Sequence, residues 1–273
     1  MKAIEYEVSE QRRQLWKIEL DICNVLLDIC NRMSLKIWAG YGTLLGAARH
    51  KGFIPWDDDM DLMIPRPDYE YLIKNFKHER YHLSSCEQEN DYLSCYARLW
   101  DTHTTMEWDN SKALEKKIGA FVDIFPIDGY PASNFQTKIF LYQVKFARAK
   151  LNMKTKKDFF EHEKWLPLKK IVRSCLKKDG NYYARALSRL AMHYDYQKSS
   201  YAGVVGASLQ HLFVEKNPKS VYENTVWLDF EDMKAPAPVG YETYLRQLYG
   251  DYMQLPPEDK RVSAHEFRIY LLK

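Results

Sequence analysis

The feature that most constrains this chain is a run of acidic residues between two apolar segments. Four aspartates lie within five positions, between residues 54–56 and 62–64: Asp57, Asp58, Asp59 and Asp61. Like charges this close repel one another, so burying them together requires a compensating cation. A solvated acidic loop is the alternative. It is disfavoured because the apolar strand expected at Leu62-Met63-Ile64 would hold the carboxylates at a buried edge.

The spacing of the acids favours a divalent cation site. Residues i and i+2 of an extended segment point to the same side, so Asp59 and Asp61 should aim at one point, with Asp57 on the same side. Hard oxygen ligands in this arrangement suit Mg²⁺ or Mn²⁺. A calcium-binding EF-hand loop is disfavoured, because its glycine and glutamate are missing at the required offsets.

A glycine-rich segment precedes the acids. Gly40, Gly42 and Gly46 punctuate residues 40–46, between a short apolar strand expected at 36–39 and a helical turn expected at 43–49. Glycine lets a backbone approach a phosphate closely, and a helix N-terminus presents free N–H groups. A plain turn would explain the glycines alone. The order of strand, glycine turn, short helix and acidic strand is the one that a nucleotidyltransferase core requires.

The remaining pattern predicts an α+β protein. An amphipathic helix is expected over residues 8–33, where apolar residues recur every three or four positions. Further helices are expected at 68–76, 135–151, 159–178, 182–195 and 241–248. Further strands are expected at 81–84, 96–100, 121–125, 202–205 and 226–230. Residues 235–238, Ala-Pro-Ala-Pro, are expected to form an extended loop, because proline removes hydrogen-bond donors.

Charge is unevenly distributed along the chain. The 273 residues carry a net charge of +3, but residues 138–178 contain thirteen Lys and Arg against three acids, which is +10, and the remainder is −7. This asymmetry indicates an anionic partner for one face of the protein. Phe159, Phe160 and Trp165 interleave with the cations, which favours an anionic membrane surface. An anionic polymer is the alternative partner, and nothing in the sequence indicates nucleic-acid recognition.

Hydropathy points to a cytoplasmic location. No stretch approaches the roughly 20 apolar residues that span a bilayer. The N-terminal residues are charged and lack the apolar region of a signal peptide. We therefore expect a cytoplasmic protein, held peripherally at the inner face of the plasma membrane if the basic segment binds lipid.

Residues 40–72, with the acidic run at their centre, closely resemble the LicD family, which includes the fukutin-like proteins. The resemblance continues at residues 121–128 and returns at 230–232, 237–241, 248–253 and 256–257, so that it covers roughly residues 25–265. It implies a nucleotidyltransferase-like mixed sheet with flanking helices. The basic helical middle is the divergent part, and its charge and helical pattern lead us to expect a separate subdomain there. Residues 1–130 and 196–273 would form the catalytic core, and residues 131–195 the subdomain that faces the acceptor or the membrane.

The resemblance also implies the metal site. Asp59 and Asp61 match the carboxylate pair of the family, and Asp123 matches its third carboxylate. These three would be the catalytic residues and the ligands of Mg²⁺ or Mn²⁺. Asp57 matches a further family acid behind the ligands. Fukutin-like members carry an added zinc-binding element, and this sequence has no cysteine cluster to build one.

The implied reaction is transfer of a phospho-alcohol from a CDP-activated donor to a glycan. For phosphocholine, a sugar hydroxyl of a teichoic-acid or lipid-linked precursor would attack the β-phosphate of CDP-choline and release CMP. Transfer of ribitol or glycerol phosphate, true nucleotidyl transfer with release of pyrophosphate, and a non-catalytic scaffold are the alternatives. One or two metals would neutralise charge on the pyrophosphate.

Several residues are expected to contact the substrate. Gly42 and Thr43 would meet phosphate. Arg49 and Lys51 would supply charge to it, although a solvated surface pair is the alternative. Aromatic faces bind quaternary ammonium groups, and Trp56 is the aromatic residue nearest the acids. Trp100, Trp108 and Tyr130 are further candidates for choline contact, with core packing as the alternative. Asp128 is the rival of Asp123 for the third carboxylate. His265 lies in the tail and could reach the site, with a surface position as the alternative.

Overall fold

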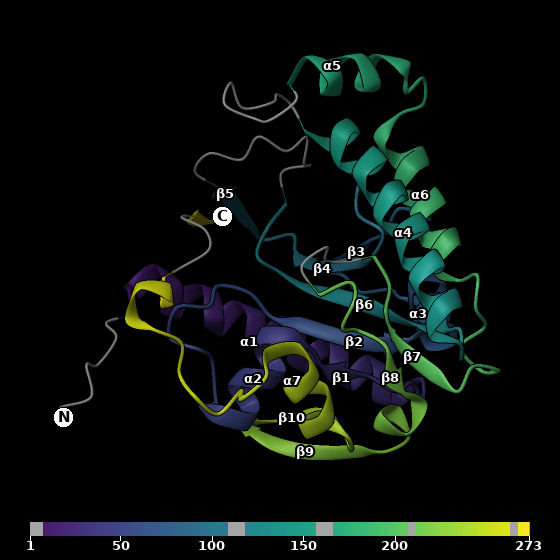
Figure 1. The fold of residues 1–273 in the computed structure, drawn as a ribbon. Helices are drawn as coiled ribbons and strands as arrows, with labels where there is room; N and C mark the ends of the chain where they lie inside the picture. Colours follow the sequence, from purple (N-terminus) through teal and green to yellow (C-terminus); the bar gives the residue numbers. More distant parts are fainter. Residues whose placement is uncertain (1–7, 109–117, 157–165, 207–210, 263–266, 273) are drawn as a thin grey trace.

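A mixed seven-stranded sheet forms the centre of the protein (Figure 1). The computed structural model describes residues 8–108, 118–156, 166–206, 211–262 and 267–272. Five strands follow the order β1-β2-β6-β4-β3, while β7 pairs with β6 and β8 with β7. The strands span Trp38–Ala39 (β1), Asp61–Pro65 (β2), Tyr81–Ser84 (β3), Ala97–Asp101 (β4), Phe121–Tyr130 (β6), Tyr201–Val204 (β7) and Asn217–Pro218 (β8). The expected α+β architecture is confirmed.

Strand β6 organises this sheet, and all ten of its residues are buried. It pairs in parallel with β2 on one side. On the other side it pairs antiparallel first with β4 and then with β7. The strand expected at 121–125 is therefore too short, because it continues through Pro126. The N–H of Asp123 donates to the carbonyl of Met60, so by alternation the nitrogen of Pro126 points away from β2. This nitrogen faces the gap between β4, which pairs with residues 121–124 of β6, and β7, which pairs with residues 127–130. Proline at this position therefore removes no hydrogen bond between strands.

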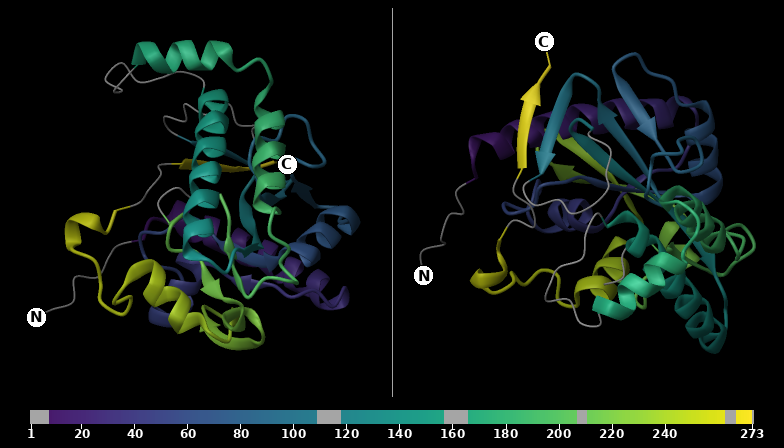
Figure 2. Two further views of the ribbon diagram at one scale, coloured as in Figure 1. Left: turned by 45° about the vertical axis from the view of Figure 1, so that its right-hand side comes forward. Right: turned by 90° about the horizontal axis from the view of Figure 1, so that it is seen from above.

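Helices cover both faces of the sheet. In the right-hand view of Figure 2, α1 lies on one side, and α4 and α6 lie on the other. Helix α1 begins after Ser9, whose side chain accepts a hydrogen bond from the Arg12 N–H, and it buries the expected stripe that includes Leu15, Ile22 and Leu26. The helices of the core span Glu10–Arg32 (α1), Tyr41–Arg49 (α2), Arg66–Asn75 (α3) and Tyr241–Tyr249 (α7).

The basic segment forms an arm of three helices that rises from the sheet (Figure 1). They span Asn134–Thr155 (α4), Leu166–Cys175 (α5) and Gly180–Ala191 (α6). Helices α4 and α6 pack together over a hydrophobic cluster that includes Phe140, Val144 and Leu187 and is distinct from the main core. The division into a core and a subdomain at residues 131 and 195 stays a prediction. In the part of the chain that the structure describes, no helix combines the length and apolar character needed to cross a bilayer.

Two strand pairs depart from the sequence expectations. Residues 235–238 are not a loop, because strand β10 (Met233–Pro238) pairs antiparallel with β9 (Thr225–Phe230). Prolines at alternate positions are compatible with a strand, since their nitrogens share one edge and the other edge can still donate. The second pair, β5 (Thr104–Trp108) with β11 (Phe267–Leu271), has no counterpart among the expected strands.

Candidate active site

The parallel register of β2 and β6 sets Asp61 directly beside Asp123. Paired residues of neighbouring strands direct their side chains to the same face of the sheet, so both carboxylates face one space. The hydroxyl of Thr43 accepts a hydrogen bond from the Asp61 N–H at 2.8 Å. Thr43 is itself buried. Thr43 therefore holds the start of β2 in place. Its hydroxyl, which we expected to contact phosphate, is hydrogen-bonded to the backbone of β2.

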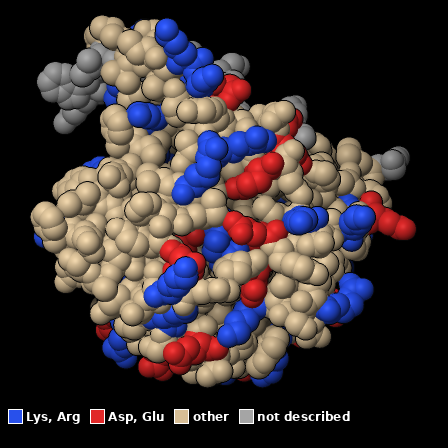
Figure 3. Space-filling view, turned by 90° about the vertical axis from the view of Figure 1, so that its right-hand side faces the viewer, with Lys and Arg blue, Asp and Glu red and all other residues tan. Residues whose placement is uncertain are grey.

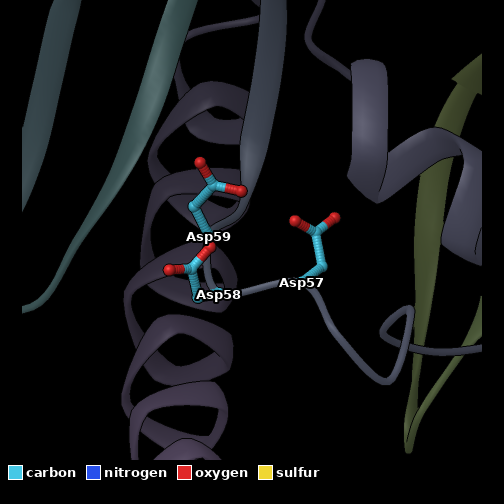
Figure 4. A group of neighbouring side chains, drawn as sticks. All are labelled: Asp57, Asp58 and Asp59. Carbon is cyan, nitrogen blue, oxygen red and sulfur yellow. The ribbon is translucent and has the colours of Figure 1, made fainter. Parts of the chain in front are cut away.

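The loop before β2 brings further carboxylates to the same place. Asp57, Asp58 and Asp59 each offer an oxygen within 4.8 Å of the others. Figure 4 shows the carboxylates of Asp57 and Asp59 extending to the same side of the loop, as the i, i+2 spacing predicts. Asp58 is buried, and among the acids it raises the pKa of Glu19 in α1 the most, after the effect of burial.

Burial and mutual repulsion act on these acids together. Burial raises the pKa of Asp57 to about 6, with a further contribution from Asp58. Burial also raises the pKa of Asp59 well above its ordinary value, with added repulsion from Asp61 and Asp57. Burial raises the pKa of Asp61 in the same way, with added repulsion from Asp123 and Asp57. The pKa of the buried Glu19 carboxyl is raised for the same two reasons. Clustered acids with such shifts mark a functional site.

Arg98 is the main cation of the site, and the sequence analysis did not identify it. Its Nε lies 2.6 Å from Oδ1 of Asp123 and its Nη2 lies 3.0 Å from Oδ2. The antiparallel register of β4 and β6 places Arg98 opposite Asp123, and its guanidinium lies 3.7 Å from the centre of the Phe121 ring. A lone arginine in an otherwise apolar expected strand was the available signal, because a strand buries a cation only opposite an acid.

These carboxylates open into a cavity of about 720 Å³. Asp57, Asp59, Asp61 and Asp123 all line it. Aromatic and apolar side chains from distant segments complete the wall. They are Tyr41, Leu45, Ile54, Trp56, Tyr96, Phe125, His211 and Tyr249, with Gly42 at the floor of the glycine turn. The lining thus combines four carboxylates with a group of rings that contact one another in the order Tyr96, Phe125, Tyr41, His211 and Tyr249.

Comparison with known proteins identifies the family. A family model described as "LicD/FKTN/FKRP, nucleotidyltransferase domain" matches residues 34–176. The chain is 30% identical over 265 residues to the lipopolysaccharide cholinephosphotransferase LicD of Haemophilus influenzae, which covers 92% of this chain and 96% of that protein. It is also 32% identical over 127 residues to an uncharacterized protein of Rickettsia typhi, over 45% of this chain and 37% of that protein.

This chain belongs to the LicD family. Membership and the name of the Haemophilus relative identify it as an enzyme, a phosphotransferase. The family match contains the acidic loop, Arg98 and Asp123, whereas His211 and Tyr249 lie beyond it.

His211 is a further residue of this LicD-family site that the sequence analysis missed. Its ring lies 6.1 Å from that of Tyr41 and 5.6 Å from that of Tyr249, measured between centroids. Burial lowers its pKa below the ordinary value of 6.5. The imidazole is therefore neutral at pH 7 and can accept a proton.

The expected phosphate contacts fall in different places. Gly42 lines the cavity, and its contact with phosphate stays a prediction. Arg49 lines an adjoining cavity of about 800 Å³, and its Nη1 donates to the carbonyls of Tyr252 and Gln254. Lys51 is exposed and lines neither of these cavities. Its backbone has a positive φ of 60°, and its carbonyl accepts the N–H of Glu231.

Apart from Trp56, the other expected contacts lie away from the cavity or outside the described residues. Asp128 forms a buried two-point pair with Arg66, in which both oxygens lie 2.7 Å from guanidinium nitrogens. Trp100 donates to the Ser84 hydroxyl. Tyr130 packs in the second hydrophobic cluster. Of the expected tryptophans, Trp56 lines the cavity. His265 and the side chain of Trp108 lie outside the described residues.

Proposed function

We propose that this enzyme transfers phosphocholine from CDP-choline to a sugar hydroxyl of a lipopolysaccharide or teichoic-acid precursor, releases CMP, and depends on Mg²⁺ or Mn²⁺. The observation that carries the proposal is one cavity lined both by carboxylates and by a group of aromatic rings. The transferred group has the matching polarity, since it joins a phosphate to a quaternary ammonium. The name of the Haemophilus relative supports phosphocholine as the group.

The donor set fits a divalent cation. Six carboxyl groups gather beside two arginines, Arg98 and Arg12, which leaves an excess of negative charge at this site. The carboxyl groups belong to Glu19, Asp57, Asp58, Asp59, Asp61 and Asp123. We assign Asp59, Asp61 and Asp123 as ligands, with Asp57 beside them. When bound, the metal would neutralise charge on the donor pyrophosphate.

The aromatic rings fit the ammonium group. Tyr41, Trp56, Tyr96 and Tyr249 present rings to the cavity, and a quaternary ammonium is attracted to such faces. Choline would then lie against the rings while the pyrophosphate lies beside the carboxylates. Glycine at position 42 leaves room for the Asp57 carboxylate, because a side chain there would overlap it.

The chain also supplies a proton acceptor. The acceptor hydroxyl forms a bond to the β-phosphorus, the bond from that phosphorus to the CMP oxygen breaks, and the hydroxyl proton must leave. Both oxygens of Asp123 already accept hydrogen bonds from Arg98, so this carboxylate is engaged. We therefore assign the proton to His211, the neutral imidazole in the same cavity.

The decisive assay offers CDP-choline, CDP-ribitol and CDP-glycerol with Mg²⁺, Mn²⁺ or a chelator, and identifies products by mass. Release of CMP from CDP-choline supports the proposal, whereas pyrophosphate release would indicate nucleotidyl transfer. Metal binding is measured separately, as a rise in melting temperature that wild type shows and Asp59→Ala or Asp61→Ala does not. No turnover and no metal-dependent rise would favour a non-catalytic scaffold.

A matched pair of tryptophan variants tests the choline assignment. Trp56→Leu should raise KM for CDP-choline by about 10-fold, since a cation–π contact is worth about 1 to 2 kcal/mol. It should affect CDP-ribitol less. Trp227→Leu is the control, because Trp227 is exposed on β9. It lines neither the 720 Å³ cavity with the carboxylates, which we call the metal cavity, nor the adjoining 800 Å³ cavity. Equal effects on the two donors would remove Trp56 from the choline site.

The proposal places the reaction at the cytoplasmic face of a membrane, where a lipid-linked glycan is available as acceptor. The adjoining cavity leaves room for a second substrate, because it shares Leu45, Ile54, Trp56 and Tyr249 with the metal cavity.

A further inference from the structure

Helix α4 carries an unusual row of exposed apolar side chains. Phe135, Ile139, Tyr142 and Phe146 are 73%, 46%, 62% and 64% exposed. Their spacing of four, three and four residues places them on one face of the helix. We call these four residues the α4 stripe. The opposite face of α4 buries Phe140 and Val144 against α6, so the stripe is a second apolar face and not the core-facing one.

The three helices of the arm that carries this stripe are basic. Helices α4, α5 and α6 contain no aspartate or glutamate. They contain ten cations: Lys138, Lys145, Arg148, Lys150, Lys154, Lys169, Lys170, Arg173, Arg185 and Arg189. Figure 3 views the side on which the arm lies. A broad uncharged area covers the left of this face, and basic side chains gather at the top.

A basic cavity of about 480 Å³ adjoins one end of the stripe. Phe146 belongs to both, and Lys150, Lys177 and Lys178 line the cavity without any carboxylate among its lining residues. The Lys150 ammonium lies 4.3 Å from the centre of the Phe146 ring. Three ammonium groups beside aromatic rings form a site suited to a phosphate group at an apolar boundary.

We propose that the arm docks on an anionic membrane surface, with the α4 stripe in the interface and the lysine cavity holding a lipid phosphate. Apolar side chains flanked by lysines are the pattern of helices that lie in a lipid interface. Charge decides between occupants. A second copy of this chain would bring two basic faces together, whereas anionic lipids complement them. The docking itself is argued independently of the proposed function. Only its purpose, to bring the active site to a lipid-linked acceptor, rests on that function.

This surface differs from the one expected from sequence. Phe159, Phe160 and Trp165, which the sequence suggested as the inserting residues, lie outside the described residues, as does Lys157. The structure assigns the apolar contact to α4 instead. The basic contribution of Lys145, Arg148, Lys156, Lys169, Lys170 and Arg173 stays a prediction.

Vesicle cosedimentation of the full chain tests the proposal. Vesicles of phosphatidylcholine alone are compared with vesicles that also contain phosphatidylglycerol, at low and high salt. The stripe variant is F135S/Y142S/F146S, and the cavity variant is K150Q/K177Q/K178Q. The control, K17Q/K74Q/K77Q, removes the same charge from three exposed lysines elsewhere: Lys17 in α1, Lys74 in α3 and Lys77 just after α3. Circular dichroism checks that each variant is folded.

We expect wild type to bind only the anionic vesicles and to be released by salt. The stripe and cavity variants should each lose at least 10-fold in partition coefficient, and the control less than 2-fold. Equal binding to both vesicle types, no binding by wild type, or an equal loss in the control would overturn the proposal. Binding of wild type to soluble polyphosphate but not to vesicles would indicate an anionic polymer. A dimer that the stripe variant dissociates, without vesicle binding, would indicate a second copy.

A separate readout distinguishes this proposal from the proposed activity. CMP release from CDP-choline without vesicles should be unchanged in all three variants, because none of their positions lines the metal cavity. Normal turnover with no vesicle binding would reject the docking surface alone.

Discussion

At the scale of single residues, the carboxylates of the cavity are stabilised poorly by the protein itself. The pKa values of Asp59 and Asp61 are raised by burial and by neighbouring acids. Each ionised carboxylate therefore opposes folding in the absence of a cation. Such a cluster is expected where ligand binding matters more than the stability of the free protein.

Alanine substitution of the carboxylate pair tests this interpretation. Asp59→Ala or Asp61→Ala should lower turnover by about 100-fold or more, the scale of losing one electrostatic contact to a reacting group. The melting temperature of the metal-free protein should hold or rise, because repulsion is relieved. Differential scanning fluorimetry and CMP release measure the two effects. Near-normal turnover with magnesium in either variant would contradict the ligand assignment.

The two aspartates of β6 should behave differently from each other. Asp128→Asn leaves the buried Arg66 without its carboxylate, which should cost about 3 to 5 kcal/mol of unfolding free energy. Turnover per folded molecule should stay near normal. Asp123→Asn should lose most activity, because an amide is a poor anionic ligand. An inactive but stable Asp128→Asn together with an active Asp123→Asn would reverse the assignment.

At the scale of elements, the start of α2 couples the glycine turn to the acids. Tyr41, the first residue of α2, has a positive φ of 38°, a strained value for a residue with a side chain. The next residue, Gly42, lies against the Asp57 carboxylate. Helix α2 thus positions one aromatic wall of the cavity and leaves space for an acid beside it.

Two glycine substitutions in α2 separate function from stability. In Gly42→Ala the new Cβ meets only the flexible end of Asp57, and alanine favours helix by up to about 1 kcal/mol. We expect an unchanged or higher melting temperature and at least a 10-fold loss of turnover. In Gly46→Ala the Cβ meets the backbone carbonyl of Gly52, so the melting temperature should fall. A Gly42→Ala enzyme with full activity would show that the position of Asp57 is unimportant.

At the scale of the whole molecule, a buried acid joins the sheet to the C-terminal helix. Glu215 is 2% exposed, and its carboxyl lies close to the Tyr41 side chain of α2 and to the Val204 backbone of β7. A charge on Glu215 would also act on Tyr244 of α7. Burial raises its pKa from 4.5 to about 8. The folded protein therefore holds this group protonated at neutral pH.

Glu215 should make stability depend on pH. Its folded pKa is raised, so its contribution is fully present below pH 4.5 and is lost as pH rises toward 8. Between these values ionisation stabilises the unfolded chain by about 1.4 kcal/mol per pH unit. Glu215→Gln should match wild type in urea unfolding near pH 4.5 and be more stable by several kcal/mol at pH 8. A difference that does not change with pH would show that Glu215 is ionised in the folded protein.

The local elements of the site follow from short stretches of the amino-acid sequence. The apolar strand after the acids, the glycine turn and helix α1 were predictable, because periodicity and punctuation within a dozen residues encode them. Resemblance to the family added Asp123 as the third carboxylate, and the structure lines the same cavity with it. Local patterns along the chain thus predicted the acidic loop, and the family resemblance supplied the third carboxylate.

Tertiary structure decided the partners. Arg98 meets Asp123 only through the β4–β6 register, and Asp128 is engaged with Arg66 across 62 positions of the chain. The aromatic wall joins Tyr41, Tyr96 and Tyr249 from three distant segments. Strand β10 forms because β9 is there to pair with it, despite its prolines. Pairing between remote segments depends on which surfaces meet after folding, and no local periodicity records that choice.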